Sequence, residues 1–325
     1  MSDVIGNSLI LPNILPEYPP RKLTDVVRYH MENPASGRNL LILHLTVVVW
    51  GFTGILGNLI SIPAIHLVWY RVGIAFVSLA IYFAIKRRSF SVNRRDFLSF
   101  FVTGGLVGLH WLLFFESIKA STVSVTLVCL SSVTLFTALV EPLFYKRRTS
   151  KLEVLVGLLI IVGIYLVFKF ESQYIKGILF GLAAALAAAF FGTINSLLIK
   201  RSGATLISLY EMAGAWVLLS LFMLVSGKFD EGMNATATDW VYLLLLGTIC
   251  TSGAYVAAVS VMKEISAFRV ALASNLEPIY GILLAWLFFG HQEKMSAGFY
   301  AGAVIILGAV FLFPVLRYRS KSRIR

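Results

Sequence analysis

Long apolar segments separated by short polar breaks run through the chain from Leu40 to Val315. Each segment holds about 20 residues, the length that an α-helix needs to cross the hydrocarbon core of a bilayer. A helix also pairs its backbone groups internally, as a segment surrounded by lipid requires. The pattern predicts an all-α integral membrane protein with ten transmembrane helices. The expected spans are 40–60, 64–85, 97–118, 122–145, 152–168, 178–199, 205–226, 240–262, 268–289 and 296–315.

Composition and charge agree with this class of protein. Hydrophobic residues make up 58% of the chain and charged residues only 14%, which excludes a soluble fold. The net charge of +12 comes from short basic clusters between apolar segments, so it indicates membrane topology and no nucleic-acid partner. The clusters alternate sides, and 21 of the 28 lysines and arginines fall on the side of both termini. The positive-inside rule then predicts a multi-pass protein of the cytoplasmic membrane with both termini in the cytoplasm.

The two terminal segments differ from the apolar body. Residues 1–39 are polar and contain five prolines, so we expect a disordered cytoplasmic segment, and residues 317–325 form a basic cytoplasmic tail. Met31 lies just before the first span, and we hypothesise that translation begins there, with residues 1–30 as an upstream extension.

The apolar body repeats itself. Residues 40–169 and 177–316 each hold five expected spans, and a shift of 140–145 residues superimposes identical residues of the two halves. Examples are Gly51 with Gly192, Tyr70 with Tyr210, Leu127 with Leu272, Phe144 with Phe289, and Gly163 with Gly308. Because five is odd, the second copy enters the membrane from the other side, so we predict two inverted five-helix repeats. Secondary transporters use such repeats to open a central site first to one side and then to the other.

Several short motifs carry a family resemblance over residues 40–316. They are Trp50-Gly51, the arginine early in the second span, Ser274-Asn275-Leu276-Glu277-Pro278, Leu287-Phe288-Phe289-Gly290 and Gly302 with Gly308. Together they resemble the EamA type of the drug/metabolite transporter superfamily. The resemblance implies a ten-helix permease that moves a small organic metabolite, often outward and often coupled to protons or exchange. Many members end both repeats with Gly-Glu, whereas this chain has Tyr145-Lys146 and Gly290-His291-Gln292-Glu293.

Charged residues inside apolar segments are the leading site candidates, because they are costly in lipid and usually face a cavity or a partner. Glu277 lies near the middle of the ninth span beside Pro278, which removes a helical hydrogen bond. We expect a kinked helix whose carboxylate binds substrate or exchanges a proton, or alternatively one that pairs with a cation to fix helix packing. Arg71 and Glu211 occupy equivalent positions of the two repeats, where either can line the cavity or form a structural contact.

Polar and aromatic residues complete the candidate set. Trp50, His110 and Asn275 are expected at the substrate site, and Tyr255 matches His110 at the 145-residue shift, which gives the cavity one polar edge from each half. The alternative for each is a contact between helices or with the interface. The two cysteines and five scattered histidines suggest no metal site, and no cofactor is expected.

The function that fits these features is secondary transport of a small organic solute by alternating access. An enzyme would need a nucleophile–base pair or a metal-ligand cluster, which the sequence does not offer. A non-transporting receptor or scaffold of the same fold is the alternative. Amino acids, other small metabolites and lipophilic cations all stay open as substrates, as does the oligomeric state.

Overall fold

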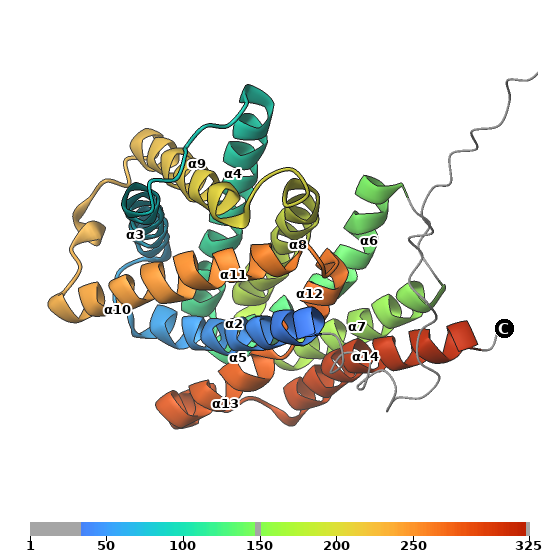
Figure 1. Cartoon of the computed structure of the whole chain (residues 1–325). Coiled ribbons are helices and arrows are strands. Elements are labelled where there is room, and N and C mark those ends of the chain that lie inside the picture. Colours follow the sequence, from blue (N-terminus) through green and yellow to red (C-terminus); the bar gives the residue numbers. More distant parts are fainter. Residues whose placement is uncertain (1–33, 147–150, 323–325) are drawn as a thin grey trace, which may run out of the picture. The chain divides into compact units, whose positions relative to one another are not determined.

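Helices form every regular element in the part of the chain that the computed structural model describes, residues 34–146 and 151–322 (Figure 1). The expectations for residues 1–30 and the start at Met31 lie outside the described residues. The α-helices are α2 (Pro34–Leu59), α3 (Ala64–Ile85), α4 (Arg94–Ala120), α5 (Val123–Leu130), α6 (Val133–Tyr145), α7 (Lys151–Phe170), α8 (Ile175–Leu198), α9 (Ala204–Val225), α10 (Ala237–Gly247), α11 (Ala254–Val261), α12 (Ala267–Ser274), α13 (Glu277–Phe289) and α14 (Ala297–Ser322). A π-helix, η3 (Thr248–Gly253), joins α10 to α11, and three short 3₁₀ turns are η1 (Ser172–Tyr174), η2 (Glu231–Met233) and η4 (Gly290–Glu293).

Eight helical segments in the described residues are long and apolar enough to cross a membrane. Two shorter apolar helices, Val154–Phe170 and Ala297–Leu312, lie where the fifth and tenth spans are expected. All-helical membrane architecture is therefore confirmed, while the count of ten spans in two inverted repeats stays a prediction.

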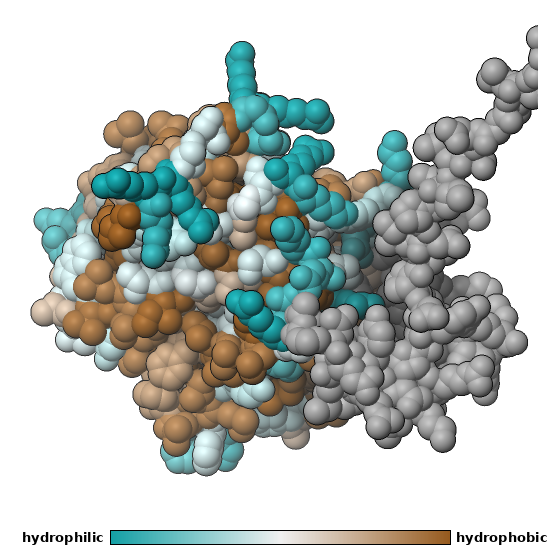
Figure 2. Space-filling view, in the orientation of Figure 1, coloured by the Kyte–Doolittle hydropathy of each residue, from teal (hydrophilic) through white to brown (hydrophobic). Residues whose placement is uncertain are grey.

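Large apolar side chains cover much of the outer surface. Figure 2 shows apolar residues over broad areas, with hydrophilic residues gathered in separate patches. Val225 is 88% exposed and Leu287 is 71% exposed, and many other leucines, valines and phenylalanines share this exposure. Apolar surface of this extent is costly in water and matches a lipid environment.

Loops and helix ends gather at two ends of the bundle. We call one the basic end, because its loops 86–93, 199–203 and 262–266 carry lysines and arginines. The opposite end holds loops 60–63, 121–122, 171–174, 226–236 and 290–296. Contacts join the elements of this end. Lys119 Nζ, in the last turn of α4, donates to the Ile60 carbonyl over 2.5 Å, and Ser296 N donates to the Glu171 carboxylate over 2.8 Å.

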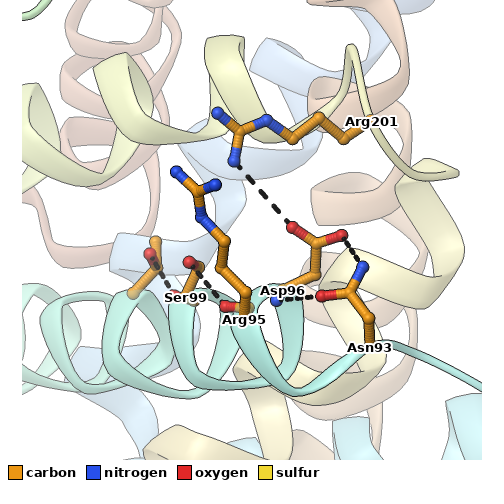
Figure 3. A network of polar contacts seen from close by, with 6 residues as sticks. Asn93, Arg95, Asp96, Ser99 and Arg201 are labelled. Atoms are coloured by element: carbon orange, nitrogen blue, oxygen red, sulfur yellow. Dashed lines mark hydrogen bonds and ion pairs between the residues drawn. The ribbon is translucent and has the colours of Figure 1, made fainter.

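A similar aspartate contact occurs at each end. At the opposite end, Asp239 accepts hydrogen bonds from Ser61 N and Ser61 Oγ, both 2.7 Å long, and joins Thr236 in a capping box at the start of α10. At the basic end, Asp96 bonds with the Asn93 cap of α4 and faces Arg201 at 3.9 Å, as Figure 3 shows. The aspartate of the opposite end therefore makes two short hydrogen bonds to Ser61, whereas the aspartate of the basic end makes one long ion pair with Arg201.

Glycines let pairs of helices approach closely. On α4 and α9, a Cβ at Gly104 would overlap the backbone carbonyl of Glu211, and one at Gly214 would overlap that of Phe101. On α7 and α14, which lie side by side in Figure 1, Gly163 and Gly302 have the same relation to each other's backbones. Small residues permit this backbone-to-backbone packing of membrane helices.

The fourth and ninth spans are each broken near their middle. In the ninth span, α12 ends at Ser274 and α13 begins at Glu277, so the break lies in the turn that precedes Pro278. In the fourth, α5 ends at Leu130 and α6 begins at Val133 without a proline between them. Backbone N–H groups in both breaks bond three residues back, as Asn275 N does to Leu272 O. Residues of both breaks line one cavity.

Glu293 holds the start of α5. Its two carboxylate oxygens accept hydrogen bonds from Val123 N at 3.0 Å and Ser124 N at 2.9 Å, and its side chain is buried. These amides are in the first turn of the helix and have no partner within it. Glu293 therefore connects the segment after α13 to the first turn of α5, which is a structural role for this acid.

Glu293→Ala is expected to lower the free energy of unfolding by about 2–3 kcal/mol, because two buried amides lose a charged acceptor. Glu293→Gln keeps one acceptor oxygen and should lose about half as much. Urea unfolding in detergent, followed by intrinsic fluorescence, measures both. Glu231→Ala, at an exposed glutamate of the opposite end, is the control. Equal stability of the Ala variant and the parent chain would contradict this role.

Candidate functional site

A cavity of about 1000 Å³, including the part that opens to the surroundings, lies between the two broken spans. Ser131 and Val133 line it from the break in the fourth span, and Asn275 and Glu277 from the break in the ninth. The full lining is Trp50, Thr53, Arg71, His110, Trp111, Phe114, Leu130, Ser131, Val133, Thr137, Ala188, Phe191, Gly192, Asn195, Tyr255, Ala258, Val259, Met262, Ala267, Val270, Ala271, Ser274, Asn275, Glu277 and Pro278. Because Met262 and Ala267 flank a loop of the basic end, the cavity extends toward that end.

Arg71 brings a buried cation to the cavity wall. It lies in α3 and is 1% exposed. Its Nε donates to Thr251 Oγ1 over 2.6 Å, and its Cζ lies 4.1 Å from the centroid of the Trp111 ring. Thr251 belongs to η3, where its hydroxyl also donates to the Leu246 carbonyl five residues back. The Nη1 atom of Arg71 has no hydrogen-bond partner.

Glu277 brings a buried carboxylate to the same cavity. It is the first residue of α13 and is 6% exposed. Arg71 and Glu277 attract each other electrostatically, yet among the described residues no ion pair within 4.0 Å connects Glu277 to a cation. The cavity therefore holds opposite charges that do not neutralise each other by direct contact.

Two asparagines are fixed at the wall with their amide oxygens free. Asn275 Nδ2 donates to Thr134 Oγ1 over 2.6 Å and to the Ala271 carbonyl over 2.7 Å. Asn195 Nδ2 donates to Tyr255 Oη over 2.9 Å. Because these partners orient both amides with the nitrogen toward an acceptor, the two Oδ1 atoms are placed as acceptors, and neither has a partner.

Glu211 lies behind this wall. Its Oε2 accepts hydrogen bonds from Tyr255 Oη at 2.9 Å and from Asn195 Nδ2 at 3.4 Å, while its Oε1 has no partner. The side chain is fully buried and does not line the cavity. Glu211 therefore contacts two lining residues, and any effect it has on a solute passes through them.

Aromatic rings form much of the remaining wall. His110 Nδ1 lies 2.8 Å from the Ala184 carbonyl, and since a carbonyl can only accept, this nitrogen carries the hydrogen. The imidazole packs against Phe191 with ring centroids 5.3 Å apart, and Trp111 meets Tyr255 at 5.8 Å. Trp50 of α2 also lines the cavity. These rings give the cavity a largely apolar surface around its few polar atoms.

The structure brings most of the predicted candidates to one place. Trp50, Arg71, His110, Tyr255, Asn275 and Glu277 line a single cavity, and Glu211 lies one residue behind it. Their roles in binding or coupling stay predictions. Sequence reasoning missed Thr251 as the partner of Arg71, because nothing in its apolar surroundings distinguishes a π-helical threonine from an α-helical one. Among the described residues, no three His, Cys, Asp or Glu side chains come together to hold a metal ion.

Comparisons with known proteins give a consistent result. A transporter of Bacillus subtilis (strain 168), named uncharacterized transporter YdfC, is 24% identical over 88% of this chain and 94% of its own length. The uncharacterized inner membrane transporter YicL of Salmonella typhimurium is 26% identical over 89% of this chain and 99% of its own length. The uncharacterized inner membrane transporter YhbE of Escherichia coli (strain K12) is 27% identical over 85% and 91%, respectively. All three relatives are named as transporters.

A solved crystal structure shares the fold, with a TM-score of 0.64 at 16% identity, over 87% of this chain and 99% of the other. The family model of the EamA-like transporter family matches this chain twice, over residues 38–169 and 175–314. These two matches cover nearly all of the apolar body and correspond closely to the two halves that the internal repetition defines. The protein is a multi-pass membrane protein and a member of the EamA-like transporter family.

Proposed function

We propose that the protein is a secondary transporter that moves a small organic metabolite across the cytoplasmic membrane by alternating access. The observation that carries the proposal is the cavity between the two broken spans, where Arg71 and Glu277 are both buried and, among the described residues, form no ion pair with each other within 4.0 Å. Charged groups within a membrane-spanning bundle normally serve a substrate or ion pathway.

Ten spans in two inverted repeats are the architecture that we propose for this mechanism. The breaks at Ser131 and Asn275 occupy equivalent positions, and both third helices begin with a capping residue followed three positions later by an aspartate. Ser61 and Arg201, which face Asp239 and Asp96, are also equivalent at the 140-residue shift. Each end of the bundle would thus carry one version of the same contact.

The difference between the two aspartate contacts supports a state open toward the basic end. There the Asp96–Arg201 pair is 3.9 Å long, whereas Ser61 bonds Asp239 twice at 2.7 Å at the opposite end. In our proposal the two contacts alternate, so that Asp96 closes on Arg201 when Ser61 leaves Asp239. With the basic end in the cytoplasm, as the positive-inside rule predicts, the cavity loads from the cytoplasm and releases outward.

Ser61→Ala is expected to raise the population open at the opposite end about tenfold, because it removes one hydrogen bond to a charged acceptor and leaves the α10 cap intact. Arg201→Ala should act in the other direction, since it weakens the contact proposed for the alternate state. The measurement is the rate at which a membrane-impermeant maleimide, added at the opposite end, labels Ser274→Cys in a chain without Cys129 and Cys250. Equal labelling rates in both variants would refute the alternating contacts.

Coupling is the second part of the proposal. Glu277 can bind either a proton or a cationic group of the solute, so a proton gradient can drive exchange across the membrane if the two compete for its carboxylate. A scaffold or receptor would also keep a cavity, but it would show saturable binding without turnover.

Untargeted metabolite profiling tests the proposal. Cells producing the intact protein are compared with cells producing Gly192→Phe, whose ring fills the cavity at a lining glycine that has nothing within 4 Å of an added Cβ. A solute class that shifts between cell and medium only with the intact protein supports transport and gives its direction. No shift at equal membrane insertion, together with saturable binding, would favour the receptor.

A further inference from the structure

Two exposed arginines from different parts of the chain face each other at the basic end. Arg95 is the second residue of α4, and Arg201 lies in the loop that follows α8. Figure 3 shows their guanidinium groups pointing toward each other. The guanidinium of Arg95 forms no hydrogen bond or ion pair with the described residues, and Ser99 bonds only to its backbone carbonyl. Two cations that face each other repel, and an anion placed between them removes the repulsion.

Asp96 leaves most of this positive charge open to a further ligand. Its Oδ1 lies 3.9 Å from Arg201 Nη1, and its Oδ2 accepts a hydrogen bond of 2.6 Å from Asn93. The side chain of Arg201 is 50% exposed and that of Asp96 only 11%. A guanidinium has five N–H donors, so one long ion pair leaves the outward-facing donors of Arg201 free for another acceptor.

An apolar stripe on α4 runs away from Arg95. Leu98, Val102 and Leu109 follow it by three, seven and fourteen residues, which places all four on one helix face. The three apolar side chains are 59%, 55% and 45% exposed. At a rise of about 1.5 Å per residue, Leu98 lies only about 5 Å from Arg95 along the helix axis. In a bilayer such a stripe contacts acyl chains, and a cation at its end lies at the level of the lipid headgroups.

We propose that Arg95 and Arg201 bind the phosphate of an anionic phospholipid. One acyl chain of this lipid lies along Leu98 and Val102. Guanidinium groups suit the phosphate, because each can offer it two parallel charge-assisted hydrogen bonds. The phosphate competes with Asp96 for Arg201. This lipid site is separate from the central cavity and does not depend on the proposed transport.

Lipid binding to the purified full-length protein in detergent, measured by native mass spectrometry, tests the proposal. The probes are dioleoylphosphatidylglycerol, which is anionic, and dioleoylphosphatidylcholine, which has the same acyl chains and no net charge. The parent protein should bind the first phosphatidylglycerol about tenfold more tightly than phosphatidylcholine. In the double variant Arg95→Gln with Arg201→Gln, this preference should fall to about twofold. Lys263→Gln with Arg269→Gln removes two other exposed cations of the same end and should keep the preference.

Asp96→Asn gives a change in the opposite direction. It removes the competing negative charge, while the new amide oxygen can still accept the hydrogen bond from Asn93. Phosphatidylglycerol should then bind about threefold more tightly than to the parent chain. Glu264→Gln removes an exposed acid of the same end and should change the affinity less than twofold.

Three results would overturn the proposal. The parent protein shows no preference for phosphatidylglycerol, or both double variants lose the preference equally, which would indicate general attraction to a basic surface. The third result concerns the source of the phosphate. Soluble glycerol 3-phosphate should displace phosphatidylglycerol at least about tenfold less well than unlabelled lipid does, because it lacks the acyl chain that contacts α4. Equal displacement would replace the lipid by a soluble phosphate as the ligand of these arginines.

Discussion

Glu277→Gln is expected to reduce transport driven by a pH gradient to background while the protein still inserts and folds. Glutamine has nearly the same size and shape as glutamate, but it can neither take up and release a proton nor carry the negative charge that attracts Arg71. Proteoliposomes loaded with the solute that profiling identifies, and then exposed to a pH step, measure the rate directly. Glu264→Gln, at an exposed loop carboxylate, is the matched control and should transport normally.

The same variant separates coupling from helix packing. Glu277 has no ion pair within 4.0 Å in the described part of the chain, so its replacement should change the free energy of unfolding by no more than about 1 kcal/mol. If the carboxylate instead fixes α13 through an essential buried pair, the loss would be about 3–5 kcal/mol. Normal pH-dependent transport by Glu277→Gln would remove Glu277 from the coupling mechanism altogether.

Hydrophobic length and helix-breaking residues predict where an apolar helix lies. The second span was expected at 64–85 and α3 is Ala64–Ile85, because lipid thickness sets the length and Pro63 sets the start. Breaks within spans are harder to predict. The break before Glu277 has a nearby proline. The break at Ser131 has none, and it is marked by local backbone hydrogen bonds three residues back, such as Ser131 N to Val128 O.

The sequence predicts those cavity residues whose charge makes them costly in lipid. Arg71 and Glu277 are charges inside apolar segments, and such charges need a reason to be there. The sequence does not predict the neighbours of the cavity residues. Thr251 contacts Arg71 because η3 is π-helical, and Phe191 contacts His110 because α8 packs on α4. The apolar part of the wall depends on which face each helix turns inward, and uniformly apolar helices do not reveal that face.

The close crossing of α4 and α9 gives the largest stability effect that we expect from a single substitution. Gly104→Leu should lower the free energy of unfolding by at least about 3 kcal/mol, at the upper end of overpacking costs, because the new Cβ overlaps the backbone carbonyl of Glu211. A flexible side chain can move aside, but a helix backbone moves only with the whole helix. The change would also displace Glu211 and, through it, Tyr255 at the cavity wall.

Gly308→Leu is the matched control, because Gly308 also lies within a long helix and a Cβ there meets nothing within 4 Å. The fraction of protein that stays monodisperse on size exclusion after heating in detergent reports the difference. Gly214→Leu, at the partner position of the same crossing, should match Gly104→Leu, since its Cβ overlaps the Phe101 carbonyl. If both crossing variants were as stable as Gly308→Leu, the two helices would be separated by more than the backbone contact described here. That result would also mean that the contact of Gly104 in α4 with the Glu211 backbone does not fix the position of Glu211 beside Tyr255.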